Sequence, residues 1–196
     1  MGLNLVVATT TAMVIVNTVV LVQGELGRPQ PDVALMLAVY GGGSMLIALG
    51  MPKLLEALPD RRVMLTGGIA LPVLLLVGTG VIAWMEDTPQ WVTLLLVWML
   101  LGAATSTVLT PSARLLRRNS TEQNRPAVFA AQFSLSHACF LITYPLAGLV
   151  GAAIGLPALA LVLVLVGTLG AIVAVLTWRT VRGSPTTTGR PTPARR

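Results

Sequence analysis

The length of the stretches without charge limits this sequence more than any other feature. About 20 apolar residues in a helix cross the roughly 30 Å hydrocarbon core of a bilayer, and every uncharged stretch reaches that length. The longest holds 53 residues, enough for two crossings, and GAAIGLP at 151–157 supplies a break inside it. Asp, Glu, Lys and Arg are absent from residues 1–24, 33–52, 63–85, 88–113 and 126–178.

These stretches predict an all-α integral membrane protein with six transmembrane helices. Only 10% of the residues are charged, whereas a soluble domain has about a quarter. Because the connections are short, the predicted transmembrane domain covers residues 1–180, and we expect no soluble domain. The predicted spans are 3–23, 33–52, 63–85, 91–111, 127–152 and 157–178.

The basic residues are divided very unequally between the two sides of this domain. Lys and Arg near the ends of spans are retained on the cytoplasmic side. Of the 13 basic residues, twelve fall on one side and only Arg28 falls on the other. The sequence therefore predicts a multi-pass protein of the cell membrane with both termini in the cytoplasm. Residues 181–196, rich in Pro, Thr and Gly, are predicted to form a disordered basic cytoplasmic tail.

The composition argues against several classes of function. The net charge of +6 is explained by orientation and by anionic lipid, so we expect no nucleic-acid partner. With one His, one Cys and no carboxylate inside a span, we expect no metal, no cofactor and no enzymatic activity. Cys139 is interpreted as a small apolar filler. The expected partners are the lipid bilayer and a small-molecule substrate.

Polar side chains concentrate in three of the six spans. Spans 63–85 and 157–178 are almost entirely apolar and are predicted to face lipid over much of their circumference. Polar groups are costly in hydrocarbon, so we interpret those of the other spans as candidates for a substrate cavity. Ser and Thr also commonly bond their own backbone or a neighbouring helix. The candidates are Thr10, Asn17, Thr105, Ser106, Gln132, Ser136 and His137.

Two amides and the histidine are the most informative of these candidates. For Asn17 and Gln132 a structural role and a cavity role are equally well supported. His137 is the only ionisable side chain well inside a span, which makes it a functional candidate; a neutral His bonded across helices is an equally good interpretation. At about 100° per residue, Gln132 and Ser136 share a face and His137 lies on another. Which of these faces lines a cavity stays open.

Three consecutive glycines interrupt the second span. Gly41, Gly42 and Gly43 follow Ala34 and Ala38, and the small residues at 34, 38 and 42 are spaced by four. Small residues at this spacing let helix backbones approach closely. Close packing is the first interpretation of the glycines, and bending of the helix during a transport cycle is the second.

Residues 50–65 (GMPKLLEALPDRRVML), 111–131 (PSARLLRRNSTEQNRPAVFAA) and 144–151 (YPLAGLVG) together resemble motifs of the major facilitator superfamily of secondary transporters. GMPKLLEALPDRRVML resembles the Gly-rich, Asp-Arg-containing loop between the second and third helices of each half, with matches at Asp60, Arg61 and Arg62. PSARLLRRNSTEQNRPAVFAA resembles the polar, basic link into the fifth helix. YPLAGLVG resembles the Pro-x-x-Gly-x-x-Gly of that helix, with matches at Pro145, Gly148 and Gly151.

The resemblance covers essentially the whole chain as one half, similar to the C-terminal half, of a twelve-helix transporter. It implies a 3+3 inverted repeat in which the first and fourth helices line the cavity and the third and sixth are peripheral. It also implies secondary active transport of a small molecule, by a permease or efflux protein, with a second six-helix half as partner. That half is either another copy or a separate chain. The alternative is a six-helix membrane protein without a transport path that serves assembly or regulation.

The charged loop has two compatible interpretations. Arg61 and Arg62 retain it in the cytoplasm, and Asp60 favours the positive N-terminal end of the third helix. In addition, Asp60 and these arginines are predicted to form a latch between helices that biases the inward-closed state.

Overall fold

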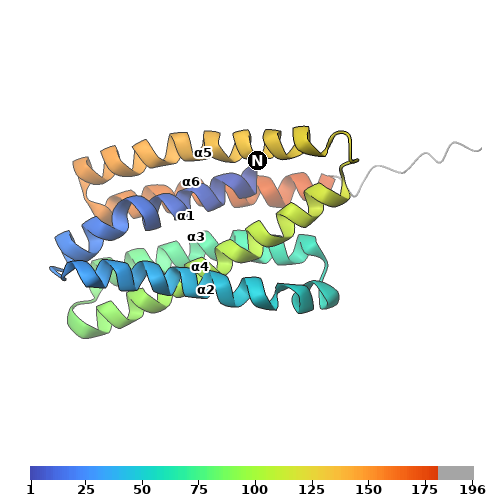
Figure 1. The fold of residues 1–196 in the computed structure, drawn as a ribbon. Helices are drawn as coiled ribbons and strands as arrows, with labels where there is room; N and C mark the ends of the chain where they lie inside the picture. Colours follow the sequence, from blue (N-terminus) through green and yellow to red (C-terminus); the bar gives the residue numbers. More distant parts are fainter. Residues whose placement is uncertain (181–196) are drawn as a thin grey trace, which may run out of the picture.

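The computed structural model describes residues 1–180, which form a bundle of long helices (Figure 1). Within these described residues, six helical segments are long and apolar enough to cross a membrane, which confirms the predicted number of spans. The predicted tail, residues 181–196, lies outside the described residues. The elements are α1 (Gly2–Val19), continued by the π-helix η1 (Val20–Glu25), α2 (Gln30–Ala57), α3 (Asp60–Trp84), α4 (Asp87–Arg118), α5 (Arg125–Ile154) and α6 (Leu156–Thr180).

Proline and glycine residues define several helix ends. Pro29 and Pro59 are the N-cap residues of α2 and α3 and have extended conformations, as is usual for the residue that precedes the first helical turn. Gly155 has a φ of +83° and separates α5 from α6, so the predicted break within 151–157 is confirmed. The helices extend beyond the predicted spans because a helix continues past the membrane core into polar sequence. Pro111 is accommodated inside α4.

The two triplets of helices pack in equivalent ways. α1 packs against α5 and α6, and α4 packs against α2 and α3. If α1, α2 and α3 are exchanged in order with α4, α5 and α6, the α1–α5 contact becomes α4–α2 and the α1–α6 contact becomes α4–α3. α3 and α6 pack against each other, which joins the triplets. This is the packing of a 3+3 inverted repeat. α1 and α4, the first helix of each triplet, have the most buried membrane-spanning stretches.

The least buried helices of the bundle are not the two with the most apolar sequences. In the most apolar stretch of each helix, 17% is buried in α2 and 11% in α5, against 44% in α3 and in α6. Just over half of each of the α3 and α6 stretches is not buried in the bundle, which leaves room for the lipid-facing surface that the sequence predicts. The prediction missed that α2 and α5 are the more exposed helices, because hydropathy does not report which helices a bundle encloses.

One glycine from each helix makes the crossing of α2 and α4 close. A Cβ at Gly43 would collide with the carbonyl oxygen of Met99, and a Cβ at Gly102 would collide with the carbonyl oxygen of Tyr40. The two backbones therefore touch without a side chain between them, which is the packing that small residues permit in membrane helices.

The other small residues of α2 do not take part in this crossing. A Cβ at Gly41 or Gly42 would meet nothing within 4 Å, and Ala34 and Ala38 are exposed. The predicted series at 34, 38 and 42 therefore lies on the open face of α2, and Gly43 alone of the three glycines makes the close contact. The face of a helix that meets its neighbour depends on how the two helices cross.

Candidate functional site

A groove of about 690 Å³ lies between α1, α2, α4 and α5. Both equivalent helices of the repeat, α1 and α4, contribute to its wall, together with the two most exposed helices. None of its residues is Asp, Glu, Lys, Arg or His, within the part of the chain that the structure describes. Its polar and aromatic residues are Asn4, Thr11, Tyr40, Thr105, Ser112, Phe129, Gln132, Phe133, Ser136 and Phe140.

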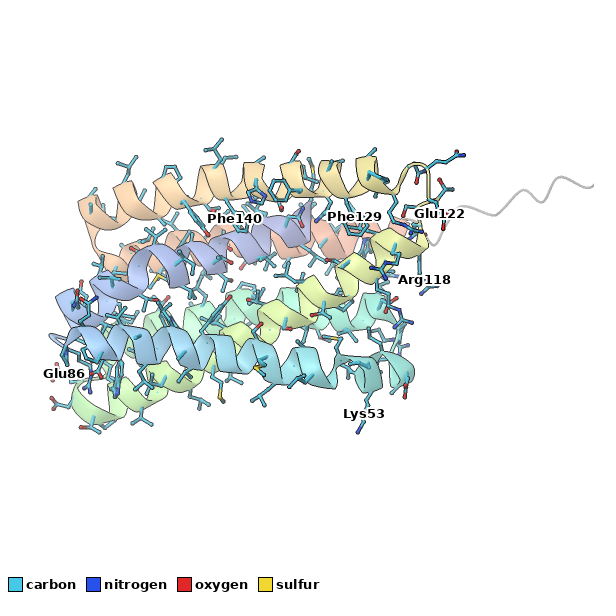
Figure 2. The ribbon with its side chains drawn as sticks, viewed as in Figure 1. Lys53, Glu86, Arg118, Glu122, Phe129 and Phe140 are labelled. Carbon is cyan, nitrogen blue, oxygen red and sulfur yellow. The ribbon has the colours of Figure 1, made fainter. Side chains whose placement is uncertain are left out.

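Aromatic rings form much of the α5 side of the groove. Phe129, Phe133 and Phe140 come from α5, and Tyr40 comes from α2. Phe129 lies near the end of the bundle that carries Arg118 and Glu122, and Phe140 lies farther along α5 (Figure 2). The groove therefore extends from this end, which we call the basic end, toward the middle of the bundle.

The polar groups of the groove link its walls in pairs. The Tyr40 hydroxyl donates to Thr105 Oγ1 at 3.3 Å and so joins α2 to α4. Thr105 in turn donates to the Leu101 carbonyl at 2.8 Å, within α4. Gln132 Nε2 donates to Asn4 Oδ1 at 2.9 Å and joins α5 to α1. Both interhelical pairs join different triplets, and the Gln132–Asn4 pair consists of two amides.

Asn4 is a groove residue that sequence reasoning missed. Its Nδ2 is buried and has no hydrogen-bond partner among the described residues. A signal was available, because Asn4, Thr11 and Thr18 recur every seven residues and share one face of a helix. The first two line the groove, and Thr18 Oγ1 accepts a hydrogen bond from Trp98 Nε1 of α4 at 3.0 Å.

Three of the predicted cavity candidates lie inside the bundle and do not line the groove. Thr10 donates to the Val6 carbonyl at 3.2 Å, within its own helix. Asn17 is buried, with its Nδ2 3.5 Å from the Ala12 carbonyl oxygen. Ser106, also buried, pairs with Thr110 of the same helix. The other candidates Thr105, Gln132 and Ser136 do line the groove.

His137 lies on the exposed face of α5 beside the groove. Its ring stacks on Phe133 with centroids 3.8 Å apart and meets the edge of Phe140 at 5.7 Å. Its Nδ1 lies 2.9 Å from the Phe133 carbonyl oxygen. Among the residues that the structure describes, the imidazole is thus bonded within its own helix, and not across helices as one interpretation of the sequence suggested. Gln132 faces α1, so the two residues do point in different directions.

An ion pair joins α3 to α4 at the basic end. Asp60, the first residue of α3, is 8% exposed; its carboxylate oxygens lie 3.2 Å from Arg118 Nη1 and 3.7 Å from Arg114 Nη1. Arg118 is labelled at the end of α4 in Figure 2. The two arginines are four residues apart, so they project from the same face of α4 and can hold one carboxylate between them.

The arginines next to Asp60 are not its partners, which corrects the predicted latch. The Arg61 guanidinium lies over the ring of Trp178 at the end of α6, 5.8 Å from the ring centroid, and Arg62 is exposed. Successive residues of a helix point about 100° apart, so neighbours in sequence do not face the same side chain. The loop motif therefore contacts two different helices.

Of the three residues matched in the fifth helix, only Gly151 makes a close contact. α5 continues through Pro145 to Ile154, and both Pro145 and Gly148 are exposed. A Cβ at Gly151 would lie 3.0 Å from Leu159 Cδ2 and 3.3 Å from Asn17 Oδ1. Gly151 thus lets α5 approach α1 and α6 near its end.

The described residues also include no arrangement suited to a metal. Within residues 1–180, no three His, Cys, Asp or Glu side chains lie close enough together to hold an ion. The groups of the groove lining that can contact a solute by polar or ring interactions are its neutral polar side chains and its aromatic rings.

A comparison with protein families agrees with this fold. The family model described as Major Facilitator Superfamily matches residues 1–196. No curated protein sequence matches the chain significantly. Members of the matched family are transporters, and six membrane-spanning helices packed as an inverted repeat are what one half of such a protein requires. The chain belongs to the major facilitator superfamily.

Proposed function

We propose that this chain is one six-helix half of a secondary active transporter, and that its groove forms part of the path of a small molecule. The observation that supports this proposal is the convergence of polar side chains from α1, α2, α4 and α5 on one groove. Such groups are costly against hydrocarbon, whereas a solvated path allows them to exchange hydrogen bonds with water and solute.

A second six-helix half completes the path in this proposal, either as another copy of the chain or as a separate chain. The two helices that flank the groove, α2 and α5, are also the least buried in the bundle. Polar Ser134 and His137 lie on the exposed face of α5. That face is better suited to protein and water than to lipid, so we place the partner against it.

The basic end faces the cytoplasm of the cell in our proposal. Lys53 and Arg118 lie at this end, and Glu86 lies at the opposite end (Figure 2). Basic residues near span ends are retained in the cytoplasm, so both termini are assigned to that side of the cell membrane. The groove, which extends from the basic end, is then reached from the cytoplasm.

Asp60 and its two arginine partners act as a cytoplasmic latch in the same proposal. The pair joins the start of α3 to the end of α4 and so stabilises one arrangement of the cytoplasmic end. Because Arg114 and Arg118 are each more than half exposed, the latch can open at a moderate cost in free energy.

The test begins with the partner and continues with flux. Native mass spectrometry of the chain, gently extracted from its own membrane, identifies whether it binds a copy of itself or another six-helix chain. The complex is then reconstituted in vesicles, and the uptake of a panel of labelled sugars, amino acids, carboxylates and aromatic compounds is measured. Thr105→Val is expected to reduce the flux of the transported solute at least several-fold, because Thr105 lines the groove.

A matched variant separates the groove from the rest of the bundle. Ser106→Ala changes a hydroxyl on the same helix that does not line the groove, and it should leave flux unchanged. Equal effects of both variants on flux would contradict a path through the groove. If Gln132→Leu disrupts assembly and the panel yields no flux, the alternative role in assembly or regulation is supported instead.

A further inference from the structure

We propose that the groove binds an uncharged, aromatic part of the transported solute. The inference rests on the proposed transport function, because it assumes that the groove is part of the solute path. The class of solute is inferred from the chemistry of the groove lining. It names the class of substrate: an amphipathic molecule that places a neutral ring system, together with a hydrogen-bond acceptor, against this half of the path.

The lining contains no charge with which a charged group could pair. Asp60, an acidic side chain at the basic end, is not part of the lining and is already held by Arg114 and Arg118. Moving a charge from water into a site without a counter-charge is expensive. A carboxylate, phosphate or ammonium group is therefore a poor fit for the groove.

The rings of the lining suit an aromatic solute in number and position. Phe129, Phe133 and Phe140 follow one another along α5, with Tyr40 contributed by α2. Aromatic rings attract one another in offset-stacked and edge-to-face arrangements. The groove volume of about 690 Å³ lies within the roughly 300–1,000 Å³ of sites that hold drug-sized ligands.

The polar groups supply a hydrogen bond at one end of the groove. Asn4 Nδ2 is a buried donor without a partner in the described chain, although the Oδ1 of the same amide is paired with Gln132 at 2.9 Å. Because this nitrogen is enclosed by its neighbours, a carbonyl, ether or hydroxyl oxygen of a solute reaches it only when the surrounding side chains move, and the bond then removes the penalty of leaving the donor unpaired. The groove thus combines a ring-binding wall with a donor that a small rearrangement exposes.

The experiment compares two fluorescent probes that differ by one charge. N-Phenyl-1-naphthylamine is uncharged, and 8-anilino-1-naphthalenesulfonate has the same rings with an added sulfonate. Each is titrated onto the full chain, with any partner that copurifies, in nanodiscs, and the signal of empty nanodiscs is subtracted. We expect saturable binding of the uncharged probe and binding of the sulfonate at least about tenfold weaker.

Variants assign the binding to the groove. The double substitution Phe133→Ala and Phe140→Ala should weaken the uncharged probe about tenfold, because two ring contacts are lost. Phe133 is 62% exposed, and unchanged thermal unfolding of the double variant would show that the fold is kept. Leu165→Ala is the matched control, since Leu165 is an equally exposed apolar residue on α6 that does not line the groove.

The outcomes distinguish this inference from the proposed function. Equal binding of both probes, or no effect of the double variant, would overturn the substrate class. Flux of a sugar or carboxylate that Thr105→Val abolishes, without binding of the uncharged probe, would also overturn it while transport through the groove stands. Groove-dependent binding of the uncharged probe, with no flux of any solute in the panel, supports the binding site and contradicts transport.

Discussion

The α2–α4 crossing and the α5–α1 crossing are equivalent positions of the inverted repeat, but they are built differently. α2 meets α4 through Gly43 and Gly102, where an added Cβ would collide with the backbone of the other helix. α5 meets α1 through hydrogen bonds, from Gln132 Nε2 to Asn4 Oδ1 at 2.9 Å and from Thr143 Oγ1 to the Ala8 carbonyl at 3.3 Å.

The comparison indicates which helix of the pair is held more firmly. Contact between backbones is lost steeply with distance, so α2 is held in a single close position on α4. Hydrogen bonds between side chains can be exchanged for bonds to water or solute at little net cost. We therefore expect α5, which also carries the three phenylalanines of the groove, to be displaced more easily than α2.

The largest effect is expected from closing the space at the α2–α4 crossing. Gly102→Ala places a Cβ against the Tyr40 carbonyl oxygen and should lower the free energy of unfolding by about 3 kcal/mol, the upper end for overpacking. Thermal unfolding in detergent measures the change. Gly42→Ala is the control, because a Cβ there meets nothing within 4 Å; equal stability of the two variants would disprove the role of this crossing.

A smaller effect is expected from the ion pair that joins α4 to α3, the other helix of the first triplet that packs against α4. Asp60→Asn removes the charge shared by Arg114 and Arg118 and should cost about 1–2 kcal/mol. Membrane insertion should be intact while transport, or the balance between conformations, changes. Glu56→Gln alters an exposed carboxylate near the same loop and serves as control. Transport by Asp60→Asn that equals that of the control would remove the latch.

The smallest effect is expected from the amide pair that holds α5. In a double-mutant cycle, Asn4→Leu and Gln132→Leu should show a coupling energy of about 0.6 kcal/mol, the average for hydrogen bonds between membrane helices. Unfolding in detergent provides the four stabilities, and limited proteolysis of the link before α5 reports its displacement. A coupling as large as the Gly102→Ala effect would mean that the two crossings are equally firm.

The sequence predicted the helices that line the groove more reliably than it predicted the lining residues. It identified the polar first, fourth and fifth spans, and all three contribute to the groove. It chose Thr10 and Asn17 in the first span, although Asn4 and Thr11 line the groove. Both sets repeat every seven residues, so periodicity alone does not distinguish the face toward the groove from the buried face that carries Thr10 and Asn17.

The sequence by itself determined the six spans, the break within residues 151–157, the unequal distribution of basic residues and the resemblance to the family. The spans and the side of the basic residues depend on how each segment interacts with the bilayer, and that interaction is nearly additive along the chain. Only the tertiary structure decided that Asp60 pairs with Arg114 and Arg118, and that α5 is the most exposed helix. Partners of this kind depend on the rotation and crossing of helices far apart in sequence, which hydropathy and charge do not specify.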